Sequence, residues 1–175
     1  MIEMPTRMRH LPPMPKPDNK SHLTAIARKN LPTPVKWILQ NQKPPTASPK
    51  FFGKVLDFGC GKCELVNPPD WDNYDPYYNP YGIKRKKYDT IFCTYVLCTL
   101  MMEDRKKVLE QIESLLEPML GVAYITVRND KPKQGWGFTK RNTYQGRATE
   151  LNGKLQLVHS TSQYRIYRLH PPGKI

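Results

Sequence analysis

The sequence of 175 residues predicts an α/β fold built around a mostly parallel sheet, and two stretches of the chain support this. In the first, a short apolar run ends in Asp57, and the step Gly59-Cys60-Gly61 follows where a buried strand would turn. Glycine lets the backbone bend sharply there, and ligands of such folds bind beyond the carboxyl ends of the strands. In the second, an amphipathic helix pattern over residues 103–117 leads into an apolar strand pattern over 122–127. A strand, a crossover helix and another strand build a parallel sheet.

The length fits one domain with a single core. Residues 1–21 are rich in proline and basic residues, and we expect them to form an extended arm before a folded domain over residues 22–175. No window is long and apolar enough to cross a membrane, and the first residues lack the apolar stretch of a signal peptide. We therefore expect a cytoplasmic protein without a membrane partner.

Two helices are expected at the start of the domain, within residues 23–42. The first covers residues 23–30. Thr33-Pro34 then has the form of an N-cap followed by proline at the first helical position, which predicts a second helix that ends near Gln42. Prolines over residues 44–49 indicate a linker into the first strand.

The remaining elements follow from apolar patterns. A brief second strand over residues 71–74 ends at Asp75, and the apolar run 90–100 predicts the next strand. The four basic residues 84–87 between them are expected in a solvated turn. Residues 129–153 are polar and loop-like, and the patterns at 154–159 and 164–169 predict a terminal antiparallel hairpin.

The acid-x-Gly-x-Gly step at residues 57–61 resembles motif I of the class I S-adenosylmethionine (AdoMet) methyltransferases. It is not the dinucleotide fingerprint, because the third glycine of that motif would fall at Glu64. The resemblance implies a reduced Rossmann-like sheet. In the full fold a helix, a strand and a helix separate the second strand from the fourth. Only about thirteen residues follow Asp75 before Tyr88, so we expect the usual third strand to be missing.

The same resemblance implies an AdoMet site at the tips of the first, second and fourth strands. A glycine turn beside an acid can hold the methionine end of AdoMet, and a carboxylate after the second strand can accept the ribose hydroxyls. Asp75 is the first choice for that carboxylate and Asp72 the second. The expected cofactor-binding residues are Asp57, Phe58, Gly59, Cys60, Gly61, Asp75, Pro76, Thr94 and Tyr95.

A closer resemblance covers residues 22–169. The stretches TAIARKNLPTPVKWIL, YDPYYNP, CTYVLCTL, VAYITVRND and GFTKRNTYQ together are similar to a small family of methyltransferases from bacterial and phage genomes associated with DNA phosphorothioation. That family tends to read CNYVLN at the fourth strand, whereas this chain has Thr94 and Cys98 at the asparagine positions. The difference puts catalysis in doubt. No general base stands out, and the catalytic candidates are Tyr95, Thr94, Lys140 and Arg141.

The net charge of +13 is concentrated in the two flanks of the chain. Residues 1–50 carry nine Lys or Arg against two acids, and residues 131–175 carry nine against one, while residues 51–130 are slightly acidic. Such flanks suit a polyanionic partner, most simply a nucleic acid, although they also suit a merely soluble surface. Aromatic residues among the cations could stack bases. The expected contacts are Arg28, Lys29, Lys133, Trp136, Lys140 and Arg141.

Cysteine and histidine give no sign of a metal site. Cys60-Gly61-Lys62-Cys63 has the C-x-x-C form, but Cys93 and Cys98 do not complete a zinc site and no histidine lies near either pair. A disulfide framework is not expected either. The sequence thus predicts an AdoMet-dependent methyltransferase acting on nucleic acid. The alternatives are a catalytically silent AdoMet- or nucleic-acid-binding accessory protein and a small-molecule or protein methyltransferase.

Overall fold

The computed structural model describes residues 20–42, 52–62 and 67–171. The arm up to residue 19, the proline-rich linker over residues 44–49 and the segment directly after Lys62 lie outside these residues. The predicted arm and linker therefore stay predictions.

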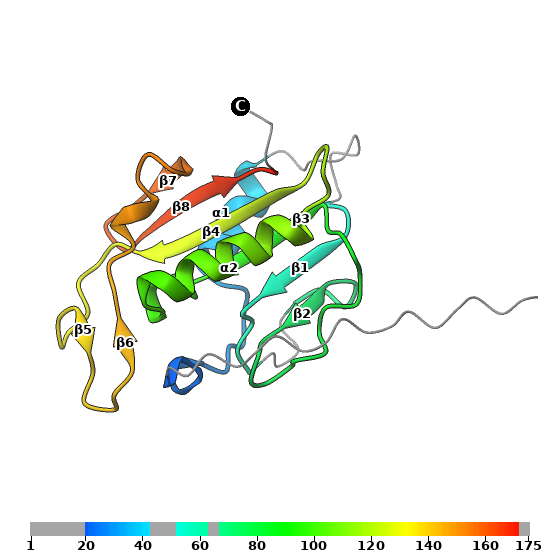
Figure 1. Ribbon diagram of the computed structural model, residues 1–175. Coiled ribbons are helices and arrows are strands. Elements are labelled where there is room, and N and C mark those ends of the chain that lie inside the picture. Colours follow the sequence, from blue (N-terminus) through cyan, green and yellow to red (C-terminus); the bar gives the residue numbers. More distant parts are fainter. Residues whose placement is uncertain (1–19, 43–51, 63–66, 172–175) are drawn as a thin grey trace, which may run out of the picture.

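A single mixed sheet of six strands forms the body of the protein, in the order β2-β1-β3-β4-β8-β7 (Figure 1). The first four of these strands are parallel, and β8 and β7 are antiparallel to their neighbours. This confirms the expected reduced Rossmann-like sheet with a terminal hairpin, in which β2 is one edge strand and no third strand lies beyond it among the described residues. The strands are β1 (Val55–Phe58), β2 (Asp72–Tyr74), β3 (Thr90–Thr94), β4 (Val122–Arg128), β7 (Gln156–Ser160) and β8 (Tyr164–Leu169).

One helix packs on each face of the sheet. Helix α1 (Thr33–Asn41) lies behind the sheet in Figure 1, and helix α2 (Met102–Leu115) lies in front of it. Side chains of a strand alternate between faces, so successive residues enter different cores. Val55 packs with the buried residues of α1, and Leu56 packs with those of α2. Both faces of the central strands are therefore buried, which explains their nearly continuous apolar sequences.

The predicted helix over residues 23–30 is wrong. A short 3-10 turn, η1 (Lys20–Thr24), stands at its start, and the chain then runs on without helical structure. Neither segment has an apolar face to bury, since η1 contains no buried residue and Ile26 is 68% exposed. The second predicted helix is α1. Its proline is at the start as expected, but Thr33 makes no side-chain cap.

Two further segments differ from the prediction. Strand β3 ends at Thr94, because Tyr95 has a φ of +63° and the chain continues into the 3-10 turn η2 (Leu97–Thr99). The polar segment after β4 is not a plain loop. It forms a small separate hairpin from β5 (Gly137–Phe138) and β6 (Tyr144–Gln145), then the 3-10 turn η3 (Thr149–Leu151).

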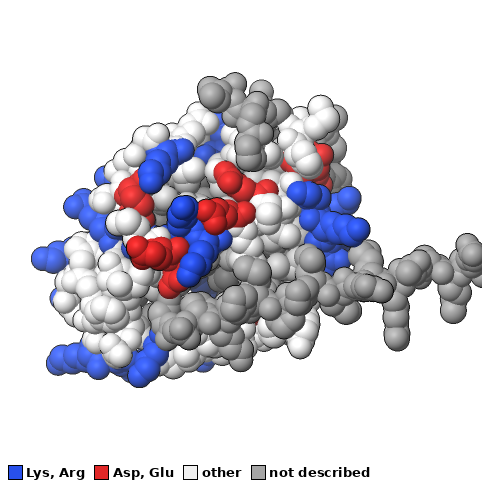
Figure 2. Space-filling model, viewed as in Figure 1, with Lys and Arg blue, Asp and Glu red and all other residues white. Residues whose placement is uncertain are grey.

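Charge is distributed unevenly over the visible face of the molecule. Acidic and basic side chains alternate over α2, separate basic side chains stand out along the end formed by the β5–β6 hairpin, and a denser basic group lies on the opposite side of this face (Figure 2). None of the helices in the described residues has the length and apolarity to cross a bilayer.

Candidate functional site

The turn after β1 is joined directly to the end of β2. The amides of Gly59 and Cys60 both donate to the carbonyl oxygen of Tyr74, at 2.7 and 3.0 Å. The amide of Gly61 donates to Oδ2 of Asp75 at 3.0 Å. Parallel strands end at the same edge of a sheet, and these three bonds hold the two strand ends together there.

Glycine is required twice in this turn. Gly59 has a φ of +76° and Gly61 a φ of +68°, in the left-handed region that other residues rarely adopt. A Cβ on Gly59 would lie 2.3 Å from Cγ2 of Val96, and one on Gly61 would lie 3.2 Å from Cβ of Ala25. The turn is therefore packed between the residues that follow β3 and the segment that follows η1.

A cavity of about 710 Å³ opens beside this turn. This volume falls within the range of about 300–1,000 Å³ that is typical of sites for small ligands. The end of β3, the first turns of α2 and the segment over residues 21–28 complete its walls. Eight of the nine expected cofactor residues line it, namely Phe58, Gly59, Cys60, Gly61, Asp75, Pro76, Thr94 and Tyr95.

Asp57, the ninth, is not among the lining residues. Its carboxylate accepts a hydrogen bond from Nδ2 of Asn67 at 2.7 Å. Burial raises the pKa of Asp57 to about 6, and the bond from Asn67 opposes this effect. Asp57 therefore supports the turn from behind rather than facing the cavity.

The carboxylate of Asp75 is held by three backbone amides. Its Oδ1 accepts from the amides of Tyr77 and Tyr78, at 2.9 and 3.0 Å, and its Oδ2 accepts from Gly61. A carboxylate has about four acceptor positions, so roughly one is left for a ligand. Asp75 lines the cavity and is 8% exposed, which gives a fixed acceptor of low mobility.

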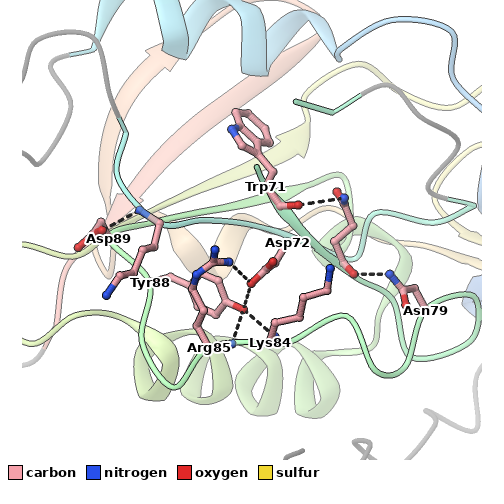
Figure 3. Close-up of polar contacts among 9 residues, drawn as sticks. Trp71, Asp72, Asn79, Lys84, Arg85, Tyr88 and Asp89 are labelled. Carbon is pink, nitrogen blue, oxygen red and sulfur yellow. Dashed lines mark hydrogen bonds and ion pairs between the residues drawn. The ribbon is translucent and has the colours of Figure 1, made fainter. Parts of the chain in front are cut away.

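Asp72, the second choice for a ribose ligand, has a structural role instead. Oδ2 of Asp72 accepts from the hydroxyl of Tyr88 at 2.7 Å and forms an ion pair with Arg85 (Figure 3). The same hydroxyl accepts from the amides of Lys84 and Arg85 at 3.0 and 3.1 Å. Asp72 does not line the cavity. The basic stretch 84–87 is thus anchored by Arg85 and is not simply a solvated turn.

Tyr95 lies at the end of β3 in a strained backbone conformation. A φ of +63° is rare for a residue other than glycine, and such strain often marks a functional position. The guanidinium carbon of Arg28 lies 5.7 Å from the centre of the Tyr95 ring, within the range of a cation–π contact. Burial raises the pKa of Tyr95 to about 12, so its hydroxyl stays protonated near neutral pH. Tyr95 can therefore stack or donate, but it is a poor general base.

Several lining residues were not identified from the sequence. The ring of His22 stacks on that of Tyr77 with centroids 4.1 Å apart, and the hydroxyl of Tyr78 donates to the carbonyl oxygen of His22 at 3.0 Å. These contacts hold η1 across the cavity. No local signal marks His22, because its partner is more than fifty residues away in the chain. Other polar lining residues that the sequence did not indicate include Arg128, Asp130, Gln145 and Gln163.

The expected nucleic-acid contacts fall in two places. Arg28 lines the cavity, while its neighbour Lys29 is exposed and does not. Lys133, Lys140 and Arg141 are exposed on or beside the β5–β6 hairpin, and Trp136 is partly buried there. None of these four residues lines the cavity. Of the four catalytic candidates, Thr94 and Tyr95 therefore line the cavity, whereas Lys140 and Arg141 lie outside it.

The cysteines differ from the expectation at one position. Cys60 takes part in a disulfide, although no disulfide was expected. Cys93 and Cys98 are buried free thiols, and burial raises the pKa of both. Among the described residues no group of three or more His, Cys, Asp and Glu is arranged to hold a metal ion.

Neither a protein-family model nor a curated protein sequence matches the chain. Solved structures resemble it at low identity, among them the following three. Magnesium protoporphyrin IX methyltransferase from Synechocystis PCC 6803, with bound SAM, is 16% identical at a TM-score of 0.43, over 78% of this chain and 75% of that one. 1,6-Didemethyltoxoflavin-N1-methyltransferase from Burkholderia thailandensis is 17% identical at a TM-score of 0.47, over 86% of this chain and 78% of that one. The PH0226 protein from Pyrococcus horikoshii OT3 is 12% identical at a TM-score of 0.46, over 79% of this chain and 86% of that one. We draw no functional argument from likeness at this level.

Proposed function

We propose that the protein is an AdoMet-dependent methyltransferase whose cofactor binds in the cavity beside the Gly59–Gly61 turn. The observation that carries this proposal is the joining of the two strand ends. The glycine turn and the carboxylate of Asp75 are fixed side by side through the bond from the Gly61 amide, and both line the same cavity. AdoMet has a nucleoside sugar and a charged amino-acid end. The sugar could donate to the carboxylate of Asp75 while the amino-acid end lies against the backbone of the glycine turn.

The residues present fit such a cofactor. Two buried polar atoms of lining residues, Oγ1 of Thr94 and Nδ1 of His22, have no hydrogen-bond partner among the described residues. Buried polar groups are rarely left unpaired, so a ligand with several donors and acceptors would satisfy them. When bound, AdoMet supplies an electrophilic methyl group on a sulfonium that is already a good leaving group. The chain would then act mainly by orienting the acceptor and excluding water.

We propose a nucleic acid as the acceptor, on the basis of charge. Residues 131–149 carry five Lys or Arg and no acid. All five are exposed, and the hairpin that they surround extends from the rim of the cavity, where Gln145 of β6 contributes to its wall. Contacts from such cations to phosphates give affinity that falls steeply with salt.

Calorimetry with AdoMet and S-adenosylhomocysteine (AdoHcy) tests the cofactor. Asp75→Asn should weaken the binding of both compounds, because a side-chain amide cannot accept hydrogen bonds at every position that the carboxylate offers. Glu103→Gln, an exposed change at the start of α2 that does not touch the cavity, should bind as the unchanged protein does. No heat with either compound would refute the proposal.

Transfer of a radiolabelled methyl group to pooled DNA, RNA, protein and metabolite extracts tests the acceptor. We expect label in a nucleic-acid pool. Label in protein or metabolites alone would refute the acceptor. Cofactor binding without transfer to any pool would instead support a silent binding protein.

A further inference from the structure

We propose that the part of the cavity around Tyr95 receives a single unstacked nucleobase. This inference rests on the proposed function and names the acceptor group of that same site. The residues that would hold the base are Arg28, Tyr95, Arg128, Asp130, Gln145 and Gln163, all of which line the cavity.

These residues converge from separate parts of the chain. The amide of Tyr95 donates to the carbonyl oxygen of Thr126 at 2.9 Å, which fixes the end of β3 against β4. The amides of Asn129 and Asp130 both donate to the carbonyl oxygen of Gln163, at 2.9 and 3.3 Å, so the ends of β4 and β8 are joined as well.

Gln145 reaches the same place from the β5–β6 hairpin. The amide of the following residue, Gly146, donates to the carbonyl oxygen of Cys98 in η2 at 2.7 Å. A Cβ on Gly146 would lie 2.3 Å from a guanidinium nitrogen of the buried Arg105. The base of the hairpin is therefore packed firmly beside the residues that follow Tyr95.

The aromatic and cationic groups favour a flat aromatic ligand. Tyr95 and Arg28 face each other at 5.7 Å, which combines a ring with a planar cation. Unpaired bases bind to proteins by stacking on aromatic rings and on guanidinium planes. The strained backbone of Tyr95 holds the ring in this position at an energetic cost. Such strain is concentrated at functional sites, which agrees with a role of this ring in stacking a ligand.

The polar groups match the edge of a base. Arg128 donates to both carboxylate oxygens of Asp130, through Nε at 3.1 Å and through a terminal nitrogen. These bonds lower the pKa of Asp130, so it remains an acceptor at neutral pH. A carboxylate accepts from exocyclic amino groups, and carboxamides such as those of Gln145 and Gln163 offer a donor and an acceptor together.

The base must leave its stack to enter. A nucleotide within a duplex cannot place its base in a closed pocket, so enzymes that modify bases use single strands or flip the base out. Exposed cations on the hairpin lie outside the cavity, where they can contact the phosphates on either side of the inserted base. Single-stranded nucleic acid therefore fits both regions.

Fluorescence anisotropy in the presence of AdoHcy can separate base contacts from phosphate contacts. The probes are labelled 12-nucleotide single strands of DNA and of RNA, and an abasic 12-unit sugar–phosphate strand. We expect the base-bearing strand of the preferred sugar to bind about 5- to 140-fold more tightly than the abasic strand, as expected for one stacked base.

Arg28→Ala and Lys29→Ala are a matched pair, because each removes one cation from neighbouring positions but only Arg28 faces Tyr95. The advantage of the base-bearing strand should vanish in Arg28→Ala and persist in Lys29→Ala, while both bind the abasic strand somewhat less tightly. Gln163→Ala, a change of an exposed residue, should alter the ranking of homopolymers without weakening the abasic strand.

Three results would overturn the inference. These are equal binding of base-bearing and abasic strands, equal loss in both variants of the pair, or no binding of any strand. AdoHcy calorimetry on the same samples distinguishes the causes. Retained AdoHcy heat with either of the first two results removes the base site alone. Retained heat without binding of any strand also removes the nucleic-acid acceptor, and lost heat removes the proposed cofactor site.

Discussion

Replacing Gly59 with alanine tests the packing of the turn most directly. Gly59 has a φ of +76°, and an alanine in the left-handed region costs about 1–2 kcal/mol. The new Cβ would also lie 2.3 Å from Cγ2 of Val96, and overpacking of this kind costs a further ~1–3 kcal/mol. We therefore expect the free energy of unfolding to fall by about 2–5 kcal/mol, which is a large share of the roughly 5–15 kcal/mol typical of a domain.

Gly153→Ala is the matched control. Gly153 has a φ of +79°, but nothing lies within 4 Å of the position that its Cβ would take. The backbone cost is therefore the same, and only about 1–2 kcal/mol should be lost. Guanidinium chloride unfolding, followed by circular dichroism at fixed pH, gives both values.

The double variant Gly59→Ala/Val96→Ala isolates the contact. Removing the methyl groups of Val96 should recover the part of the loss caused by the clash, so the two changes should be non-additive by about 1–3 kcal/mol. If Gly59→Ala and Gly153→Ala lose the same amount, and the double variant is additive, then Val96 does not restrict the turn and our account of its packing is wrong.

Three further changes test the structure. The native pKa of Asp57 is raised from 3.8 to about 6, so unfolding releases a proton between these values and stability falls as the pH rises. The unchanged protein should lose about 2 kcal/mol of stability from pH 4 to pH 7 that Asp57→Asn does not lose. Parallel urea-midpoint profiles would contradict this. Arg85→Met leaves the buried carboxylate of Asp72 with one partner fewer, so it should lower the free energy of unfolding by about 1–3 kcal/mol. Lys86→Met, a change of an exposed residue, should alter it by under about 0.5 kcal/mol. Equal urea midpoints of the two variants would show that the ion pair does not stabilise the fold. A Cβ on Gly82 would lie 1.6 Å from the carbonyl oxygen of Asn73, so Gly82→Ala should shift β2 or prevent folding, and an unchanged thermal midpoint would refute that contact.

The cavity wall shows where sequence reasoning worked. Gly59, Gly61 and Asp75 follow the ends of adjacent strands, and parallel strands end at one edge, so short motifs were enough to bring them together. Asp57 and Asp72 failed as lining residues for one reason. Whether a carboxylate faces a ligand depends on its partners, and Asn67 and Arg85 are not marked by any local pattern.

The N-terminal segment and the β5–β6 hairpin are the parts of the structure that sequence reasoning did not predict. Residues 20–28 have no periodic apolar face, so their position across the cavity depends on contacts with Tyr77 and Tyr78 far along the chain. The segment that follows the hairpin likewise depends on the buried Arg105, which donates to the carbonyl oxygen of Arg147 at 3.2 Å and forms an ion pair with Glu150. A charged residue on an amphipathic helix is normally expected at the surface.

The amino-acid sequence alone determined most strands of the sheet, its shortening and the glycine turn, because apolar periodicity, interval length and glycine act over a few residues. Only the tertiary structure decided which polar groups line the cavity and which support it from behind. That choice depends on burial and on hydrogen-bond partners distant in the chain. The backbone strain at Tyr95 and the Arg128–Asp130 pair therefore became visible only once β3, β4 and β8 were assembled side by side.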